Sequence, residues 1–329
     1  RTLINSVSLN SKEVKKNSVF FGVKGQKFDG NKFGIEAIKN NAILAITNKR
    51  FKNSRNIFNK NPLEILNKLS SVYRKSLDSN NIAITGSAGK TSVKDLTGFC
   101  LNKLDKTYYS KNSFNNKYGV PLSILNSPQS TKFSVLEVGM DKKGEIDSLT
   151  KLIRPNLGLI TNISYAHIKN FKNLNEIAKA KGEIINNIFP SGVMIINKDD
   201  KFCNYFLSRA KMRNLNIITF SKKNKLADVV YLGQKKNRNE YLCKFLIKAK
   251  IKFFAIPEHL INYKENILST LSIISSYFNI DELPTSLFLN FEIPKSRGSI
   301  VNYNRGKKKI TIIDESYNSN PLSFKFALE

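Results

Sequence analysis

The sequence has few histidines and few cysteines, and each shortage narrows the range of possible functions. It contains only two histidines, so a Ser–His–Asp arrangement for nucleophilic catalysis is not expected. Its three cysteines lie far apart, without a Cys-x-x-Cys pair or a Cys/His cluster of the kind that binds zinc. They are therefore expected to be reduced thiols in the core of a cytoplasmic protein.

Long apolar runs are also absent from the sequence. Apolar stretches are short and separated by charged residues, so neither a membrane span nor a signal peptide is predicted. A length of 329 residues suggests two or three domains, and a monomer is expected. The chain opens on Arg1 and closes on Glu329 within a predicted helix, so both ends are expected to be truncated.

Acidic residues are scarce relative to basic ones. The sequence has 54 Lys and Arg against 25 Asp and Glu, which gives a formal net charge of +29. Such a charge invites a nucleic-acid-binding function. The lysines are, however, spread along the whole chain, and no block of aromatic residues alternates with Arg. An anionic substrate explains the charge equally well, so no nucleic-acid partner is expected.

Residues 82–92 have the pattern of a phosphate-binding loop between a strand and a helix. An apolar β-branched run leads into Gly86 and Gly89, which permit a tight turn whose N–H groups can point at phosphate oxygens. Lys90 supplies a cation, and the Thr91 hydroxyl can bind Mg²⁺. The alternative is a structural Gly-rich turn. The short spacing between the two glycines also makes generic P-loop proteins a poor match.

Strand and helix patterns divide the chain into three predicted units of α/β type. Residues 1–78 have two buried strand patterns and are predicted to form a small domain. Residues 79–297 alternate strands with helices, which is typical of a mostly parallel sheet. Within this unit a strand meander is predicted over 227–256 and a helix over 281–290. Residues 298–329 are predicted to be the truncated start of a third, Rossmann-like domain.

Polar residues follow two predicted strands of the central unit. Glu137 ends the strand that begins at residue 133, and His167 follows the strand at 157–161. Because ligands in parallel sheets bind beyond the carboxyl ends of the strands, both side chains are expected beside the phosphate loop. With the Thr91 hydroxyl they can form a Mg²⁺ shell. A solvated glutamate and a structural histidine are the alternatives.

Lys181 lies in the middle of an apolar stripe on a helix predicted over residues 173–189. A lysine on a buried face has a lowered pKa, so it can be neutral and react with CO₂. The resulting carbamate is an anion that can approach a metal ion. The alternative is a lysine that extends along the edge of the stripe toward water.

Several motifs in combination resemble the Mur ligase family. The Asn-rich stretch at 112–121 is an ordinary loop when taken alone, but it recurs with the others in that family. The motifs are TGSAGKTS at 85–92, NSFNNKYGVP at 112–121, EVG at 137–139, GEI at 144–146, TNI at 161–163, AH at 166–167, AKAKGEI at 178–184 and DESYNSNP at 314–321. Residues 7–12 and 25–30 also resemble the UDP-binding first domain of the family.

The resemblance covers essentially the whole chain and implies an activity. It implies an ATP-dependent ligase that forms an amide bond through an acyl phosphate in the synthesis of peptidoglycan precursors. Two loops, at 112–121 and 314–321, favour the family member that adds D-alanyl-D-alanine to UDP-N-acetylmuramoyl-tripeptide. The implied fold is a UDP-binding domain, a P-loop ATPase-like central domain with a mostly parallel sheet, and a third domain that is largely absent from this chain.

The resemblance also implies roles for individual residues. Lys90, Lys181 and His167 are the implied catalytic residues, and Ser11 and Lys12 would contact the UDP group. One Mg²⁺ would be bound by Thr91 and Glu137, and a second by His167 and carbamylated Lys181. Asn266 would lie beside the adenine, Arg297 at a phosphate, and Asp314 or Glu315 at the ribose. The full implied ATP-binding set is Gly86, Ser87, Ala88, Gly89, Lys90, Thr91, Ser92, Asn115, Asn116, Asn266, Arg297, Asp314 and Glu315.

Two alternatives to this function remain open from the sequence. The first is another Mur ligase or a folylpolyglutamate-type ligase, which would differ in the amino substrate that it accepts. The second belongs to a different class, a basic P-loop ATPase that binds nucleic acid. Stimulation of ATP hydrolysis by nucleic acid, with a steep salt dependence of binding, would distinguish the second.

Overall fold

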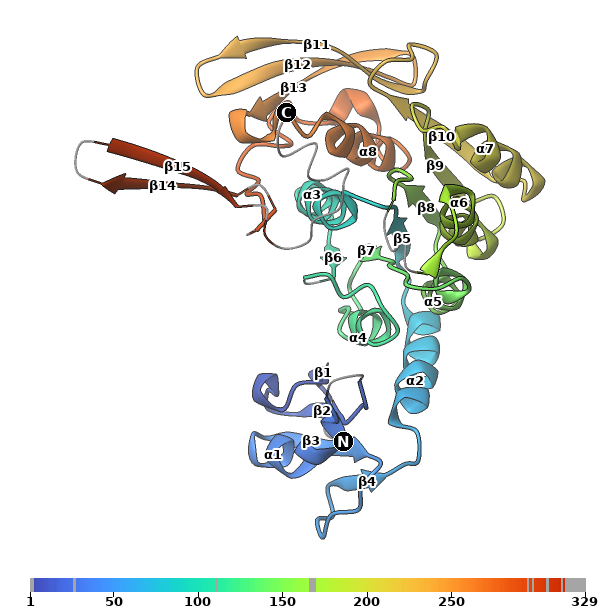
Figure 1. The fold of residues 1–329 in the computed structure, drawn as a ribbon, viewed down its shortest axis with the longest axis vertical. Coiled ribbons are helices and arrows are strands. Elements are labelled where there is room, and N and C mark those ends of the chain that lie inside the picture. The colour runs from blue at the N-terminus through green and yellow to red at the C-terminus, as the bar shows by residue number, and fades with distance from the viewer. Residues whose placement is uncertain are drawn as a thin grey trace.

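The computed structural model describes residues 3–25, 28–110, 112–165, 170–294, 296–297, 299–305, 308–314 and 316. These residues form three β-sheets, and helices pack against the two larger ones, so the predicted α/β class is confirmed (Figure 1). Among the described helices, none combines the length and the apolar character needed to cross a bilayer.

The N-terminal part is a four-stranded parallel sheet in the order β1-β2-β3-β4. Its elements are β1 Ser6–Ser8, η1 Ser11–Glu13, β2 Ser18–Phe21, η2 Gly30–Phe33, α1 Gly34–Lys39, β3 Ala42–Thr47 and β4 Asn56–Phe58. Phe20 and Ile38 pack on one face of this sheet, and Phe21 packs against Leu66 on the other. Strands β1 and β4 were not predicted, because three residues are too few to show an alternating pattern.

Helix α2, Pro62–Ser76, leads from this sheet to the central part of the molecule (Figure 1). It begins at Pro62, with the Asn61 side chain accepting from the Glu64 N–H and the proline in the first turn. At its other end the buried Arg74 donates to the carbonyl oxygens of Ile153 (2.8 Å) and Leu77 (3.2 Å). This arginine therefore fixes the helix to the central unit.

The central part is a nine-stranded sheet in the order β13-β12-β11-β10-β9-β8-β5-β7-β6. Pairing is parallel from β6 to β11 and antiparallel among the last three strands. The strands are β5 Asn80–Thr85, β6 Thr107–Tyr109, β7 Phe133–Glu137, β8 Leu157–Ile160, β9 Val193–Asn197, β10 Asn216–Ser221, β11 Val229–Asn237, β12 Glu240–Ile247 and β13 Lys250–Pro257. The antiparallel part corresponds to the predicted meander over 227–256.

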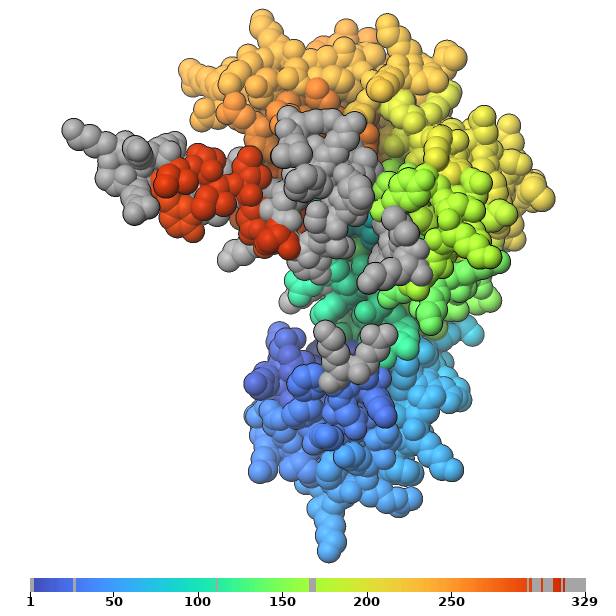
Figure 2. Space-filling view, in the orientation of Figure 1, coloured from blue at the N-terminus to red at the C-terminus, as the bar shows by residue number. Residues whose placement is uncertain are grey.

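Helices cover both faces of the central sheet and enclose two apolar cores. Helices α3 and α8 contribute to one core, and α4, α5, α6 and α7 contribute to the other. The helical segments are α3 Lys90–Asn102, α4 Gly119–Leu125, α5 Glu145–Ile153, α6 Leu174–Lys181, η4 Gly182–Asn187, α7 Cys203–Met212, η5 Glu258–Leu260, α8 Lys264–Ile274 and η6 Ile280–Glu282. In the space-filling view the N-terminal residues lie at one end of the molecule and β11–β13 at the other (Figure 2).

Three predicted segments differ from the structure. The helix predicted over 281–290 is reduced to the short segment η6 followed by turns. The helix predicted over 173–189 changes to 3-10 geometry at Gly182, and the buried Glu183 beyond it accepts from the N–H of Gly144 (2.8 Å) at the start of α5. Helix α4 begins at Gly119, inside a stretch predicted to be a loop.

Strands β14 Ser299–Arg305 and β15 Lys308–Asp314 form an antiparallel hairpin that extends away from the central body (Figure 1). The helix expected after Asn320 lies outside the described residues. The predicted domain limits at 78/79 and 297/298 stay predictions.

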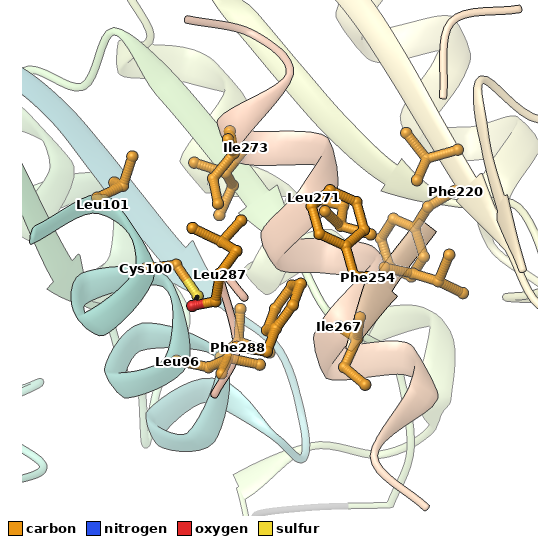
Figure 3. Close-up of a cluster of buried hydrophobic side chains, with 14 of the residues drawn as sticks. Leu96, Cys100, Leu101, Phe220, Phe254, Ile267, Leu271, Ile273, Leu287 and Phe288 are labelled. Atoms are coloured by element: carbon orange, nitrogen blue, oxygen red, sulfur yellow. Dashed lines mark hydrogen bonds between the residues drawn. The ribbon is translucent and has the colours of Figure 1, made fainter. Parts of the chain in front are cut away.

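The core between α3, α8 and the sheet allows a stability test with an internal control. Phe254 is fully buried and packs at right angles to Phe288, with ring centroids 5.6 Å apart (Figure 3). Phe254→Ala is expected to lower the free energy of unfolding by about 3–5 kcal/mol, because it leaves a cavity. The neighbouring Phe253 is 43% exposed, so Phe253→Ala is expected to cost less than about 1 kcal/mol in urea denaturation. Equal losses would contradict the packing described.

Candidate active site

The phosphate-binding loop lies between β5 and α3, as the sequence predicts. Gly89 has φ +79° and directly precedes the first residue of α3. Gly86 has φ +150°, and a Cβ there would overlap the side chain of Thr161 at the end of β8. The loop is therefore held tightly against the neighbouring strand, and both positions favour glycine.

A cleft of about 1330 Å³ opens at the carboxyl ends of the parallel strands. Its walls come from the phosphate-binding loop, the Asn-rich loop before α4, the segment after β7, α8, and the residues just before β14. The predicted residues that line it are Ser87, Ala88, Gly89, Lys90, Thr91, Ser92, Asn115, Asn116, Glu137, Asn266 and Arg297. The structure thus brings together residues as far apart in the chain as Ser87 and Arg297.

Glu137 is one of the carboxylates that line this cleft, although the residue is only 1% exposed. Its two oxygens accept from the Thr91 hydroxyl (2.6 Å) and from the Asn115 amide (2.6 Å). Within the described residues, no group of three His, Cys, Asp or Glu side chains could hold a metal ion. One carboxylate with hydroxyl and amide oxygens, completed by substrate phosphates, suits Mg²⁺, which uses few protein carboxylates.

Lys90 and Lys181 approach the same backbone oxygen. Both Nζ atoms donate to the carbonyl of Gly86, at 2.9 Å from Lys90 and 2.8 Å from Lys181. Burial lowers the pKa of Lys181 well below its usual value, and the nearby Lys90 lowers it further, while Glu137 opposes the shift. Burial also lowers the pKa of Lys90. Lys181 is 1% exposed, so it does not extend to water. The neutral amine of Lys181 therefore persists to a lower pH than that of an exposed lysine.

A residue that the sequence did not single out lies between two predicted ones. The Ser113 hydroxyl is 3.2 Å from Thr91 Oγ1 and accepts from Arg297 Nη2 at 2.8 Å. Ser113 lies two positions before Asn115, inside the motif that resembles the Mur ligases, but a lone serine in a polar loop carries no signal of its own. Only the fold brings Arg297 to it.

Other predicted residues take positions that bear on their roles. Asn266, on α8, lies beside the phosphate loop, where its side-chain oxygen would be 3.3 Å from a Cβ at Gly89. The Asn116 side chain accepts from the N–H groups of Tyr118 and Gly119 at the start of α4. Asp314 accepts from the Ser296 hydroxyl at 2.9 Å and is not among the cleft-lining residues.

Two predicted residues, His167 and Glu315, lie outside the described residues. Ser11 and Lys12 belong to the N-terminal part, where Ser11 is buried and Lys12 exposed. That part touches a loop of the cleft, since the Tyr118 hydroxyl donates to the carbonyl of Lys24 at 3.1 Å.

Comparisons with known proteins show which family the chain resembles in sequence and fold. Residues 84–273 match the family described as the Mur ligase middle domain. A UDP-N-acetylmuramoyl-tripeptide–D-alanyl-D-alanine ligase from Rickettsia prowazekii (strain Madrid E) is 32% identical, over 99% of this chain and 72% of that protein.

Two solved structures are similar to the chain as a whole. MurF from Acinetobacter baumannii has a TM-score of 0.84 at 24% identity, over 99% of this chain and 70% of its own, and shares the fold. The MurF ligase of Thermotoga maritima in complex with ADP has a TM-score of 0.79 at 25% identity, over 99% of this chain and 74% of its own.

Proposed function

The chain belongs to the Mur ligase family, and from that premise we propose that it is an ATP-dependent ligase that joins D-alanyl-D-alanine to UDP-N-acetylmuramoyl-tripeptide. The reaction is a step of peptidoglycan precursor synthesis, and the protein acts in the cytoplasm as a monomer. The single observation that carries the proposal is the cleft in which the phosphate-binding loop, Glu137 and Lys90 meet. It has the size and the charge for a nucleotide triphosphate beside a second anionic substrate.

The proposed mechanism needs alignment and charge neutralisation more than a protein nucleophile. The carboxylate of the peptide attacks the γ-phosphate of ATP and gives an acyl phosphate with release of ADP. The amine of D-alanyl-D-alanine then attacks the acyl carbon, and phosphate leaves from the tetrahedral intermediate. Lys90 stabilises the charge on the phosphates, and the N–H groups of the loop between Gly86 and Gly89 hold them in place.

Two cleft-lining residues, Thr91 and Glu137, fit a divalent metal ion. Thr91 and Glu137 would bind one Mg²⁺, and carbamylated Lys181 with His167 a second. When bound, these ions would supply positive charge that offsets the negative charge of the two reacting anions. Lys181 supports this assignment because it is buried with a strongly lowered pKa, so its neutral amine can form the carbamate.

The remaining substrate contacts follow the predicted domain organisation. Residues 1–78 would hold the UDP group through Ser11 and Lys12, and residues 79–297 the ATP. Residues 298–329 would begin the third domain. The nucleotide contacts are assigned to Ser87, Ala88, Ser92, Asn115, Asn116, Asn266, Arg297, Asp314 and Glu315.

The proposal is tested by ADP release from ATP and Mg²⁺ with UDP-N-acetylmuramoyl-tripeptide present. Release is expected with D-alanyl-D-alanine, and not with glutamate or single amino acids. Release with glutamate and a folate would point to a folylpolyglutamate-type ligase instead. Stimulation by nucleic acid in place of the peptide, weakening steeply with salt, would reject the ligase function altogether.

A further inference from the structure

Four polar side chains in the cleft form an unbroken chain of hydrogen bonds. Arg297 Nη2 lies 2.8 Å from Ser113 Oγ, Ser113 Oγ lies 3.2 Å from Thr91 Oγ1, and Thr91 Oγ1 lies 2.6 Å from Glu137 Oε2. The chain begins at a guanidinium, passes two hydroxyls and ends at a carboxylate. All four residues line the same cleft.

The chemistry of the two ends fixes the direction of every hydrogen bond. A guanidinium can only donate and a carboxylate can only accept. Arg297 therefore donates to Ser113, and Thr91 uses its single hydrogen toward Glu137. Ser113 must then donate to Thr91, because the hydrogen of Thr91 is already engaged. Bonds aligned in this way from a cation to an anion polarise one another and strengthen the whole chain.

This direction determines what the Thr91 oxygen can offer to a ligand. A hydroxyl oxygen has two lone pairs, and one of them accepts from Ser113. The other stays available for a cation in the cleft. The same serine accepts from the guanidinium of Arg297. Burial lowers the pKa of Lys90, Glu137 opposes the shift, and the charge of Arg297 lowers that pKa further.

We propose that Ser113 is a positioning residue that links Arg297 to the Thr91 hydroxyl, so that the metal-binding and phosphate-binding groups are oriented as one unit. The proposal rests on the proposed nucleotide site. It adds to that site the residue Ser113 and an energetic coupling between Arg297 and Thr91, neither of which the ligase function requires. Ser113 itself acts through its two neighbours rather than on the reacting atoms.

The link also reaches the C-terminal hairpin. Ser296, the residue before Arg297, donates to Asp314 Oδ2 at 2.9 Å, at the end of β15. The hairpin is thus tied to the same two-residue segment that supplies the guanidinium.

The loop that carries Ser113 does not depend on its hydroxyl for its shape. The fully buried Lys94 donates to the carbonyl of Asn112 at 2.7 Å and pairs with Asp95 at 2.9 Å. On the other side, the carbonyl of Asn115 accepts from the N–H of Gly139 at 2.8 Å. Removal of the serine hydroxyl is therefore expected to leave the fold and the loop intact, which makes the residue suitable for substitution.

The test is a double-mutant cycle on nucleotide binding, with Ser113→Ala, Arg297→Ala and the double variant. Dissociation constants for ATP with Mg²⁺ are measured by calorimetry, together with the Mg²⁺ concentration that gives half-maximal binding. Each single variant is expected to weaken ATP–Mg²⁺ binding about tenfold, because a hydrogen bond to a charged group is lost. The double variant is expected to be no more than about twofold weaker than either single one.

Ser113→Thr is the matched control, since it keeps a hydroxyl at the same atom and is expected to retain most of the affinity. If the fold-losses of ATP affinity in the two single variants multiplied in the double variant, Ser113 and Arg297 would act independently. If Ser113→Ala bound ATP normally, the serine would position neither neighbour. Either result overturns the proposal. Because binding is measured without the peptide or the amine, failure of the ligase function would appear separately, as absent ADP release.

Discussion

Lys90→Met is expected to weaken ATP binding and to lower kcat/KM for ATP by about 10³-fold. Lys90 lies in the phosphate-binding loop at the first residue of α3, and it donates to the loop carbonyls of Gly86 and Ser87. With a triphosphate in the cleft, the ammonium exchanges these carbonyls for phosphate oxygens, which carry far more charge. Methionine keeps much of the side-chain volume but removes the cation, so the loss reports the charge.

The Lys90 measurement combines nucleotide calorimetry with steady-state rates, and Lys106→Met serves as the control. Lys106 follows the end of α3, is exposed and lies outside the cleft. Lys106→Met lowers the formal net charge of +29 by one, as Lys90→Met does. If both variants lost affinity equally, the effect would come from net charge rather than from the phosphate loop. If Lys90→Met bound ATP normally, the phosphates would have to lie elsewhere.

Local patterns predict the parts of this site that lie on single elements. The glycines of the phosphate loop need unusual backbone angles, and their spacing shows this directly in the sequence. Glu137 was found because parallel strands end at one edge of their sheet, and a strand pattern shows where each end falls. Lys181 was found because a charged residue interrupted an apolar stripe, and the structure buries it as expected.

Contacts between segments far apart in the chain could not be predicted from the sequence, because they depend on how the chain folds back on itself. Ser113 and Arg297 are 184 positions apart, and their hydrogen bond depends on how the segment before β14 returns to the cleft. The same applies to Lys94, which is fully buried and donates to carbonyls of a later loop in addition to pairing with Asp95. Neither Ser113 nor Lys94 interrupts a local sequence pattern, so in the sequence each looks like an ordinary polar residue.

The helical segment that carries Lys181 shows a further limit. Its apolar stripe continues past Gly182, so periodicity predicts one helix to residue 189. The structure instead tightens the segment to 3-10 geometry, with Glu183 accepting N–H groups from the start of α5. Tertiary contacts of a buried carboxylate outweigh the small difference between the two helix types. The orientation of Lys181, at the last residue of α6, is set by this arrangement.

Lys181→Ala is expected to reduce ligation about 10³-fold while leaving the fold intact. In the proposed modification the neutral amine attacks CO₂, a C–N bond forms, and one proton is released to give the carbamate. Because burial and Lys90 lower the pKa of Lys181, the neutral amine persists to a lower pH than for an ordinary lysine. Activity is therefore expected to be present above the lowered pKa and to be lost below it. There the carbamate nitrogen takes up a proton, the C–N bond breaks with release of CO₂, and the amine is held protonated.

Chemical rescue separates the carbamate from a purely structural lysine. Short carboxylic acids can enter the space left in Lys181→Ala and supply the missing carboxylate, so they are expected to restore part of the activity. Lys179 is an exposed position on the same helix, so Lys179→Ala is the control. It is expected to be as active as the protein without any substitution. Full activity of Lys181→Ala without added acid would reject the carbamate. Loss without rescue, together with a lowered unfolding midpoint, would assign Lys181 to holding the carbonyl of Gly86 instead.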